Sequence, residues 1–574
     1  MARAGILRLL DKPKGKCMRL PVLSLLLAFA VSSPAFAVAP APRTEVARHA
    51  GTLLEQACPD AKAPGAAVLV ARGDEVLYRG ACGAASIELG VPLSPDQVFR
   101  LGSITKQFAA AGVLKLAEDG KLSLDDPLTR FVPGYPGGDK ITARMLLNHT
   151  SGIRSYTDMP GVMEGPIQKT VTTAQLIDTF KAEKPDFAPG QDWHYNNSGY
   201  VLVGAVIEAA SGMPWHAYLK QSLFDPLGLR HTGYGDESLG LIPGHVTGYT
   251  LANDKWAAAQ YLSMSQPHAA GALVSTVDDL LRWNRALHEG KVLKDASYRQ
   301  MITPVGKAAA EKYGFGIVHE QLRGQDMLQH GGGIFGFSTY LLYLPAEDVT
   351  AAVLYNADSG RPPGIGTGTL ARMLAARAIG KPYPQKQAIA IDAGALAEYE
   401  GVYRIDKDAA RVLRVVDGKL TSQRTGSPSY VLIPIGKDDF LFEEGLSRMR
   451  FERDAAGKPV AMRFFADDEG EGELVERSDE PLPTERASVA LPRRALERLV
   501  GHYAHEGMLM AVALREDQLT AQLSGQPAFE IFAESPTKFF LKVVEASLEF
   551  APGDAPASSV TLHQGGQVLE FKRQ

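Results

Sequence analysis

The stretch around Ser103 constrains this chain more than any other part of it. Ser103 and Lys106 lie three residues apart, at the start of a run of good helix formers that ends at Asp119-Gly120. We expect Ser103 to open and cap this helix, and Gly120 to supply the left-handed residue that closes it. Residues at i and i+3 share one helix face, so the lysine amine can reach the serine hydroxyl. The pattern predicts a nucleophile with a base beside it.

The same S-x-x-K pattern occurs a second time, at Ser535 and Lys538, in a strand-rich stretch near the C-terminus. No further polar motif accompanies this copy, so we interpret it as a turn. The alternative for the first copy is an ordinary capped core helix. Gly102 before the serine, the amphipathic helix after it and two polar motifs downstream argue against that alternative.

A targeting segment precedes the folded part of the chain. Four basic side chains between positions 12 and 19 come before an apolar run at 20–31, which Ala35-Phe36-Ala37 follows. We interpret residues 1–37 as a signal peptide cleaved after Ala37, with Met18 as an alternative start, and we expect an exported, periplasmic or secreted protein. The apolar run is too short to span a bilayer. The formal net charge of −5 gives no reason to expect nucleic-acid binding.

Cys58 and Cys82 are the only cysteines after the predicted signal peptide. Residues Ala66–Arg72 and Glu75–Cys82 are predicted to form an antiparallel hairpin around a Gly-Asp turn, which returns Cys82 close to Cys58. In an oxidising compartment a disulfide would join them. Two separate buried thiols are the alternative.

The chain divides into a large first domain and two smaller ones. Predicted strands at both ends of residues 38–385 flank a helical middle, which favours an α+β domain with an antiparallel sheet and a helical region. Beyond the break at 381–384 the sequence repeats: Leu396–Tyr403 recurs as Leu496–Tyr503, and Phe440 and Phe451 match Phe539 and Phe550. We therefore predict two small antiparallel β-barrel-like domains at 386–478 and 492–574, joined by a linker at 479–491.

Two more polar clusters lie in the first domain. Tyr195-Asn196-Asn197 ends a loop and enters a predicted helix, and His330-Gly331-Gly332-Gly333 is expected to begin a strand. Taken alone, the first is also typical of a helix-entry turn and the second of a glycine-rich bulge or turn. Their order after Ser103 makes them informative together.

The succession of S-x-x-K, Y-x-N and a late H-x-G resembles the serine β-lactamase and penicillin-binding-protein superfamily, in its class C-like branch, from Ala66 to about Ile379. The resemblance implies Ser103 as nucleophile and Lys106 as its partner. It further implies Tyr195 as general base or proton relay, and Asn197, His330 and Gly332 as substrate-binding residues. The backbone N–H groups of Ser103 and Gly333 would form the oxyanion hole. Lys106 and Tyr195 would titrate as a coupled unit, so which of them is the base stays open.

One residue departs from the pattern of the superfamily. His330 stands where lactamases and transpeptidases carry the lysine of K-T-G. Histidine has a reference pKa of about 6.5 and is mostly neutral at neutral pH, whereas a lysine is a permanent anchor for a carboxylate. We therefore expect substrates that lack a free α-carboxylate to be preferred. His149, on a predicted loop, is interpreted as structural.

These observations predict an exported serine hydrolase that forms an acyl-enzyme on Ser103. We expect amide or ester substrates, cleaved by a peptidase of the D-aminopeptidase or carboxypeptidase type or by an esterase; the tandem β-domains resemble those of D-aminopeptidases. A β-lactamase and a catalytically idle protein that binds cell-wall peptides or penicillin are the alternatives. The partner would be a small molecule or a peptide, including one derived from peptidoglycan. We expect no cofactor, and no spacing of histidine, cysteine and carboxylate side chains argues for a metal. The oligomeric state stays open.

Overall fold

The computed structural model describes residues 40–574 apart from short gaps, which are 160, 164, 166, 253–254, 361–364, 385–387, 408, 426, 444, 469, 484–487, 506–507, 516–517, 524–528, 543–545, 554 and 565–566. The predicted signal peptide and its cleavage site lie outside the described residues. Among the helices of the described part, none combines the length and the apolar character that a bilayer crossing requires.

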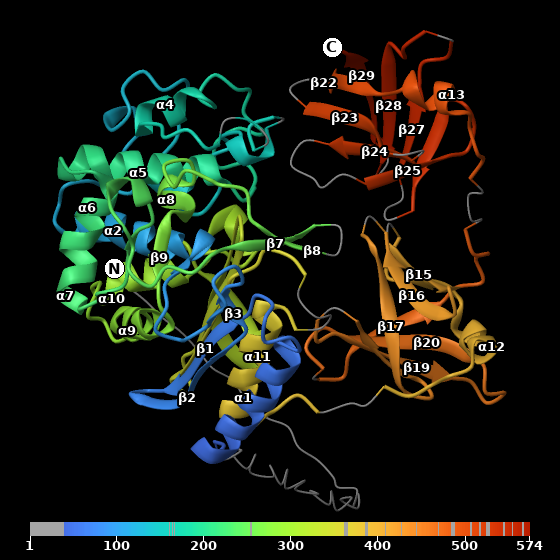
Figure 1. Ribbon diagram of the computed structural model, residues 1–574, viewed down its shortest axis with the longest axis horizontal. Coiled ribbons are helices and arrows are strands. Elements are labelled where there is room, and N and C mark those ends of the chain that lie inside the picture. Colours follow the sequence, from blue (N-terminus) through green and yellow to red (C-terminus); the bar gives the residue numbers. More distant parts are fainter. Residues whose placement is uncertain are drawn as a thin grey trace, which may run out of the picture. The chain divides into compact units, whose positions relative to one another are not determined.

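A six-stranded antiparallel sheet forms the centre of the first domain, in the order β10-β11-β12-β13-β1-β2 (Figure 1). Its strands are β1 (Ala66–Arg72), β2 (Glu75–Cys82), β10 (Val318–Leu322), β11 (Gln325–Ile334), β12 (Phe337–Leu344) and β13 (Val349–Tyr355). The first strand pairs with the last, with Ala66 opposite Tyr355. The sheet therefore joins the two ends of the domain, as the sequence predicted. The hairpin of β1 and β2 carries Cys82 to Cys58, and the two are joined by a disulfide.

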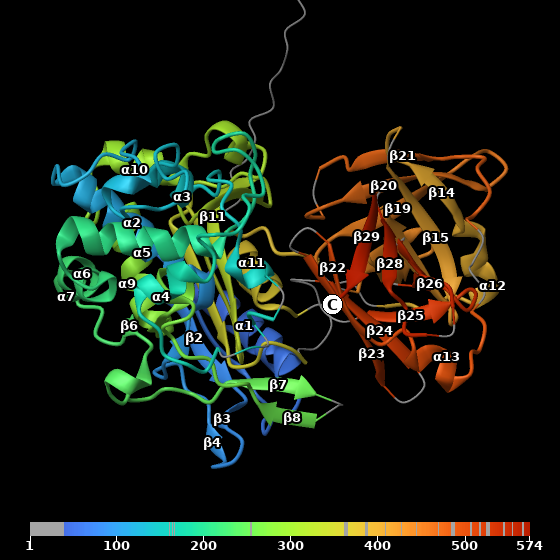
Figure 2. The same ribbon diagram turned by 90° about the horizontal axis from the view of Figure 1, so that it is seen from above.

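Helices cover both faces of this sheet (Figures 1 and 2). Helices α1 (Arg43–Ala57) and α11 (Thr367–Ala378) pack on one face, and α9 (Val277–His288) packs on the other, with α2 (Thr105–Glu118) and α5 (Asn197–Ser211) beyond it. Strand β1 shows why both faces are covered. Val68 and Val70 belong to the core beneath α1 and α11, whereas Ala67 and Leu69 belong to the core on the side of α2 and α5. A strand buried on both faces is apolar throughout.

Shorter elements complete the first domain. Its short strands are β3 (Ala84–Ser86), β4 (Val91–Pro92), β5 (Phe99–Arg100), β6 (Gly233–Tyr234), β7 (Tyr249–Ala252), β8 (Lys255–Ala258) and β9 (Leu273–Ser275). Its remaining α-helices are α3 (Ala143–Leu147), α4 (Thr173–Asp178), α6 (Trp215–Leu219), α7 (Asp225–Leu227), α8 (His268–Gly271) and α10 (Asp295–Ile302).

Two strand positions predicted from the sequence are wrong. The apolar and aromatic run Tyr313–Val318 predicts a strand, but residues 313–317 form a loop and β10 begins only at Val318. Gly316, in this loop, has φ +69°, and a Cβ there would lie 2.7 Å from the backbone of Lys106. The loop therefore packs directly on the start of α2, which an extended strand would not do. The cluster from His330 to Gly333 ends β11 instead of beginning a strand.

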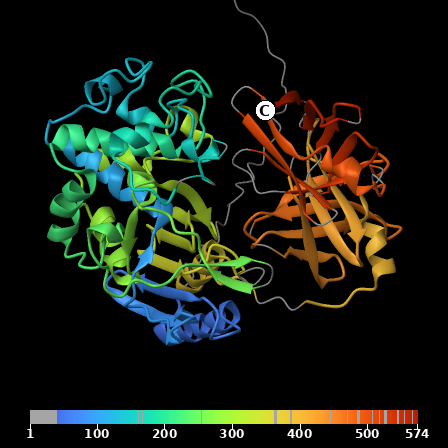
Figure 3. The ribbon, with the colours of Figure 1, turned by 45° about the horizontal axis from the view of Figure 1, so that its top comes forward.

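Two closed barrels of eight antiparallel strands each follow the first domain (Figure 3). The first contains β14 (Gly401–Arg404), β15 (Ala410–Val416), β16 (Lys419–Arg424), β17 (Ser429–Gly436), β18 (Asp439–Phe442), β19 (Arg448–Arg453), β20 (Pro459–Phe465) and β21 (Glu473–Arg477). The second contains β22 (Gly501–His505), β23 (Met508–Arg515), β24 (Gln518–Leu523), β25 (Phe529–Ala533), β26 (Lys538–Leu541), β27 (Ala546–Phe550), β28 (Ser559–Gln564) and β29 (Gln567–Arg573). Short helices α12 (Ala393–Leu396) and α13 (Arg493–Glu497) precede the two barrels.

The repeat seen in the sequence is also a repeat of side-chain geometry. The rings of Phe440 and Phe451 lie edge to face at 5.5 Å, and those of Phe539 and Phe550 also lie edge to face at 5.5 Å. The second S-x-x-K copy lies in the turn before β26, where the Ser535 hydroxyl accepts hydrogen bonds from backbone N–H groups. It is a turn, as predicted.

Candidate active site

Ser103 lies in a single 3-10 turn, Gly102–Ile104, between β5 and α2. The α-helix begins at Thr105, and no side chain caps it. The prediction that Ser103 opens and caps the helix is therefore wrong by one short turn, and the Ser103 hydroxyl is left to make other contacts. Gly102 has φ +55°, a backbone conformation that glycine adopts without strain.

Lys106 is fully buried, with 0% of its surface exposed. Its Nζ lies 3.1 Å from Ser103 Oγ, 2.8 Å from Asn197 Oδ1 and 2.9 Å from the carbonyl oxygen of Ala270. Burial holds the pKa of Lys106 well below its usual value, because an ammonium loses its hydration there. Burial therefore favours the neutral amine over the ammonium among these three oxygen atoms.

Tyr195 ends the loop before α5, and Asn197 is the first residue of that helix. Asn196 caps this helix, with its Oδ1 accepting the Gly199 N–H at 2.7 Å. Asn197 donates from Nδ2 to the Thr157 hydroxyl at 3.0 Å. The Tyr195 ring lies 4.7 Å from Lys106 Nζ. Burial raises the pKa of Tyr195, and a hydrogen bond with Ser103 opposes this shift only in part, so Tyr195 is a neutral phenol.

His330 is buried on β11 and both ring nitrogens are engaged. Nδ1 lies 2.6 Å from the carbonyl oxygen of Gly331, so it carries the proton, and Nε2 accepts from the Tyr313 hydroxyl at 2.9 Å. Burial, followed by the nearby Lys106, lowers the pKa of His330 to about 4. His330 is therefore neutral at neutral pH. It lies behind Tyr195, with 6.3 Å between the ring centres, and is not part of the cavity wall described below.

The glycines that end β11 have different surroundings. A Cβ on Gly332 would lie 2.0 Å from the carbonyl oxygen of Leu101 and 2.3 Å from Thr339 Oγ1. Thr339 donates to that same carbonyl at 2.7 Å. Gly332 therefore lets β11 approach the segment before Ser103, and it does not face the cavity. Gly333 does line the cavity, and a Cβ there would meet no atom within 4 Å.

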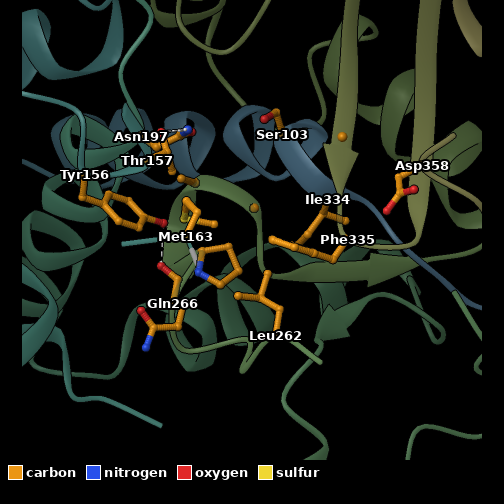
Figure 4. Close-up of a pocket in the computed structure, with 14 residues that line it drawn as sticks. Ser103, Tyr156, Thr157, Met163, Asn197, Leu262, Gln266, Ile334, Phe335 and Asp358 are labelled. Atoms are coloured by element: carbon orange, nitrogen blue, oxygen red, sulfur yellow. Dashed lines mark hydrogen bonds between the residues drawn. The ribbon is translucent and has the colours of Figure 1, made fainter. Parts of the chain in front are cut away.

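A cavity of about 320 Å³ opens beside Ser103 (Figure 4). Its wall consists of Ser103, Tyr156, Thr157, Met163, Asn197, Leu262, Gln266, Pro267, Ala270, Gly271, Gly333, Ile334, Phe335 and Asp358. Figure 4 shows Tyr156, Thr157 and Asn197 on one side of Ser103, and Ile334, Phe335 and Asp358 on the other. Among these fourteen described residues, Asp358 supplies the one carboxylate. Its Oδ2 accepts the Gly336 N–H at 2.7 Å.

His149 and Tyr313 belong to the site although the sequence did not predict them there. The His149 ring lies 4.5 Å from the ring of Tyr195 and 4.6 Å from that of Tyr313. Its Nδ1 accepts the Asn196 N–H at 3.1 Å, and burial holds its pKa well below the usual value. His149 has a structural role, as predicted. Its ring packs against Tyr195, the tyrosine of the Y-x-N motif. The motif His149-Thr150-Ser151-Gly152 was the available signal. Across the described residues, no group of three or more histidine, cysteine or carboxylate side chains is placed to hold a metal ion.

Comparisons with known proteins agree with this geometry. The profile of the Beta-lactamase family matches residues 46–376, which is more than half of the chain. Penicillin-binding protein 4* of Bacillus subtilis (strain 168) is 27% identical over 88% of this chain and 94% of its own length. D-aminopeptidase of Gluconobacter oxydans (strain 621H) is 28% identical over 56% of this chain and 60% of its own length.

A solved structure, the octameric penicillin-binding protein homologue from Pyrococcus abyssi, superposes with a TM-score of 0.53 at 23% identity, over 75% of this chain and 99% of that one. At that identity the likeness concerns the fold. The Gly102–Ile104 turn and the buried Lys106 lie within the part of the sequence that the family profile matches, and the chain belongs to the Beta-lactamase family.

Proposed function

We propose that the protein is a serine hydrolase that forms an acyl-enzyme on Ser103 and releases it with water. The observation that carries this proposal is the fully buried Lys106 amine, 3.1 Å from Ser103 Oγ. A neutral amine has two N–H groups to donate, which Asn197 and Ala270 accept, and one lone pair left for the serine proton. Lys106 is therefore arranged to act as the base.

The proposed reaction follows from this arrangement. Lys106 takes the Ser103 proton as Oγ bonds to the substrate carbonyl carbon. The backbone N–H groups of Ser103 and Gly333 hold the resulting oxyanion, and each such donor lowers a barrier by roughly 3–4 kcal/mol. Tyr195, which shares a hydrogen bond with Ser103 and whose ring centre lies 4.7 Å from Lys106 Nζ, passes the proton to the leaving amine or alcohol as the carbon–heteroatom bond breaks. Water then attacks the acyl carbon, gives a proton back through the same groups and releases Ser103.

For the substrate we propose aminoacyl amides or esters with a free amine. The cavity wall is largely apolar, and Asp358 places one carboxylate on the same side as Ile334 and Phe335 (Figure 4). The similarity to a D-aminopeptidase supports this class. The similarity to a penicillin-binding protein over most of the chain favours penicillin acylation of Ser103 as the second candidate.

We also propose that the protein is exported after removal of residues 1–37. The disulfide between Cys58 and Cys82 supports an oxidising compartment. N-terminal sequencing of the protein recovered from its native host tests this, because a chain that keeps residues 19–37 would contradict it.

The catalytic proposal is tested by labelling with a fluorescent fluorophosphonate and a fluorescent penicillin, followed by peptide mass spectrometry. We expect the label on Ser103, and we expect Ser103→Ala to abolish both labelling and turnover while the protein stays folded. Ser535→Ala is the matched control and should change neither, since its hydroxyl serves a turn. Labelling that persists in Ser103→Ala would overturn the assignment, and absence of any label and turnover in the wild type would favour an idle binding protein.

The substrate class is tested with D-phenylalanine p-nitroanilide and with 3-phenylpropanoyl p-nitroanilide, which lacks the amine. Asp358→Asn keeps an oxygen for the Gly336 N–H but removes the charge, so kcat/KM should fall about tenfold for the amine substrate alone. Asp139→Asn removes an exposed carboxylate and serves as the control. Equal losses on both substrates would mean that Asp358 has only a structural role.

A further inference from the structure

Arg100 is a buried cation without a counter-charge in contact with it. It lies on β5, three residues before Ser103, and is 7% exposed. Across the described residues its guanidinium forms no ion pair and no hydrogen bond, and its Nε is buried without a partner. Burying a guanidinium costs free energy of hydration unless an opposite charge and hydrogen-bond acceptors replace the water. Among the described residues, no carboxylate is in ion-pair contact with this charge.

A second cavity, of about 270 Å³, lies against this side chain. Its wall consists of Arg100, Glu237, His245, Val246, Thr247, Gly248, Ala258, Ala259, Gln260, Tyr261, Phe335 and Phe337. Phe335 also lines the cavity beside Ser103, so the two cavities adjoin. Aromatic rings form much of the wall, and the Arg100 guanidinium lies 5.9 Å from the centre of the Phe337 ring.

The other charged group at this cavity is already engaged. Glu237 Oε1 lies 2.8 Å from His245 Nδ1, and the His245 ring stacks on Phe337 with 6.0 Å between centres. Burial and then Arg100 lower the pKa of His245, and Glu237 opposes this shift. Glu237 acts on Arg100 only at a distance beyond ion-pair contact. One carboxylate near the cavity repels a dianion such as phosphate more strongly than it repels a singly charged group.

We propose that this second cavity binds a small molecule with one carboxylate, of about the size of an acylated amino acid, and that Arg100 holds the carboxylate. The planar fork of a guanidinium matches the two oxygens of a carboxylate. The aromatic wall takes the apolar part of the ligand. Because Phe335 borders both cavities, the bound molecule lies next to the site of the proposed acyl-enzyme; binding itself does not depend on the proposed function.

The test is isothermal titration of the full-length protein with N-acetyl-D-alanine, with its uncharged amide and with inorganic phosphate. We expect the acid to bind about tenfold or more tightly than the amide, and phosphate to bind less tightly than the acid. Ser103→Ala should leave this preference intact, which separates the inference from the proposed catalysis. Arg100→Gln should abolish the preference, and Arg100→Lys should restore part of it. Lys140→Gln removes an exposed cation and should change nothing.

A second variant covers the case in which Arg100→Gln fails to fold. Ala258 is exposed at the cavity, so Ala258→Trp narrows its mouth without touching the cation, and it should weaken binding of the acid. The inference is overturned if the wild type binds acid and amide equally, if the preference survives in folded Arg100→Gln, or if Ala258→Trp binds the acid as the wild type does. Tighter binding of phosphate than of the acid would overturn the choice of a monocarboxylate.

Discussion

At the scale of single residues, burial favours the neutral forms of the ionisable groups around Ser103. The pKa values of Lys106, His149 and His330 are lowered and that of Tyr195 is raised, in each case mainly by loss of hydration. The spacing of Ser103 and Lys106 was enough to predict their contact, because one helix turn brings them together. The contact between Tyr313 and His330 was not predictable, since it depends on a loop packing against a strand of the sheet.

The lowered pKa of Lys106 predicts how activity depends on pH. In the proposed mechanism the neutral amine is the reactive form, so kcat/KM should fall as the pH drops through the lowered pKa of Lys106 and the amine becomes an ammonium. In Lys106→Arg the side chain stays protonated at every accessible pH. We expect that variant to lose at least a hundredfold in kcat/KM throughout pH 4–9. Wild-type turnover in Lys106→Arg would show that this amine is not the base.

Because His330 is neutral, we expect a preference for substrates without a carboxylate next to the scissile bond. Because its pKa is about 4, His330 offers no charge at neutral pH to a carboxylate next to the scissile bond. His330→Lys should therefore raise kcat/KM for a cephalosporin free acid relative to its methyl ester. Tyr313→Phe removes the hydroxyl that contacts His330 without adding charge, and should leave the ratio unchanged. A wild type that already favours the free acid would contradict this account.

At the scale of elements, two close approaches position the Gly102–Ile104 turn that carries Ser103. The end of β11 packs on Leu101 through Gly332, and the loop before β10 packs on the start of α2 through Gly316. Strands β1 and β2 were predictable, because clear turn residues bound them. The loop at 313–317 was not predictable. Its apolar and aromatic residues are typical of a strand, and only its tertiary contact with Lys106 excludes a strand there.

The two neighbouring glycines of β11 offer a matched test of this packing. Gly332→Ala places a methyl group against the Leu101 carbonyl and Thr339, so we expect a loss of about 1–3 kcal/mol in stability or more, with impaired turnover. In Gly333→Ala the added methyl group meets open space, so the free energy of unfolding should stay that of the wild type. Thermal unfolding of both proteins makes the comparison. Equal melting temperatures would show that β11 shifts at little cost.

At the scale of the whole molecule, each barrel has its own buried core. The cores share their pattern, since Phe440 and Phe539 are 0% and 1% exposed and each contacts a second phenylalanine of its own barrel. The repeat in the sequence was sufficient to predict two domains of one kind. The number of strands and the closure of each barrel were not predictable from it, because closure depends on pairing between the first and last strands.

The shared core pattern predicts equivalent effects of equivalent substitutions. Phe440→Ala and Phe539→Ala should each destabilise their own barrel by about 3–5 kcal/mol, because each removes a buried aromatic ring. Differential scanning calorimetry with limited proteolysis would identify the affected barrel, and kcat/KM for the amide substrate would report on the first domain. We expect kcat/KM to stay unchanged. A fall in activity in either variant would show that the barrel influences catalysis.

The pairing of β1 with β13 also sets an order of events during synthesis. The hairpin of β1 and β2 leaves the ribosome early, yet the strand that flanks it is completed only with Tyr355. Contacts between segments so distant in the chain form late, because a long loop must close before they gain any energy. Until then, an apolar strand edge is exposed and open to wrong partners. The nascent chain therefore has its greatest need of a chaperone before β13 is complete.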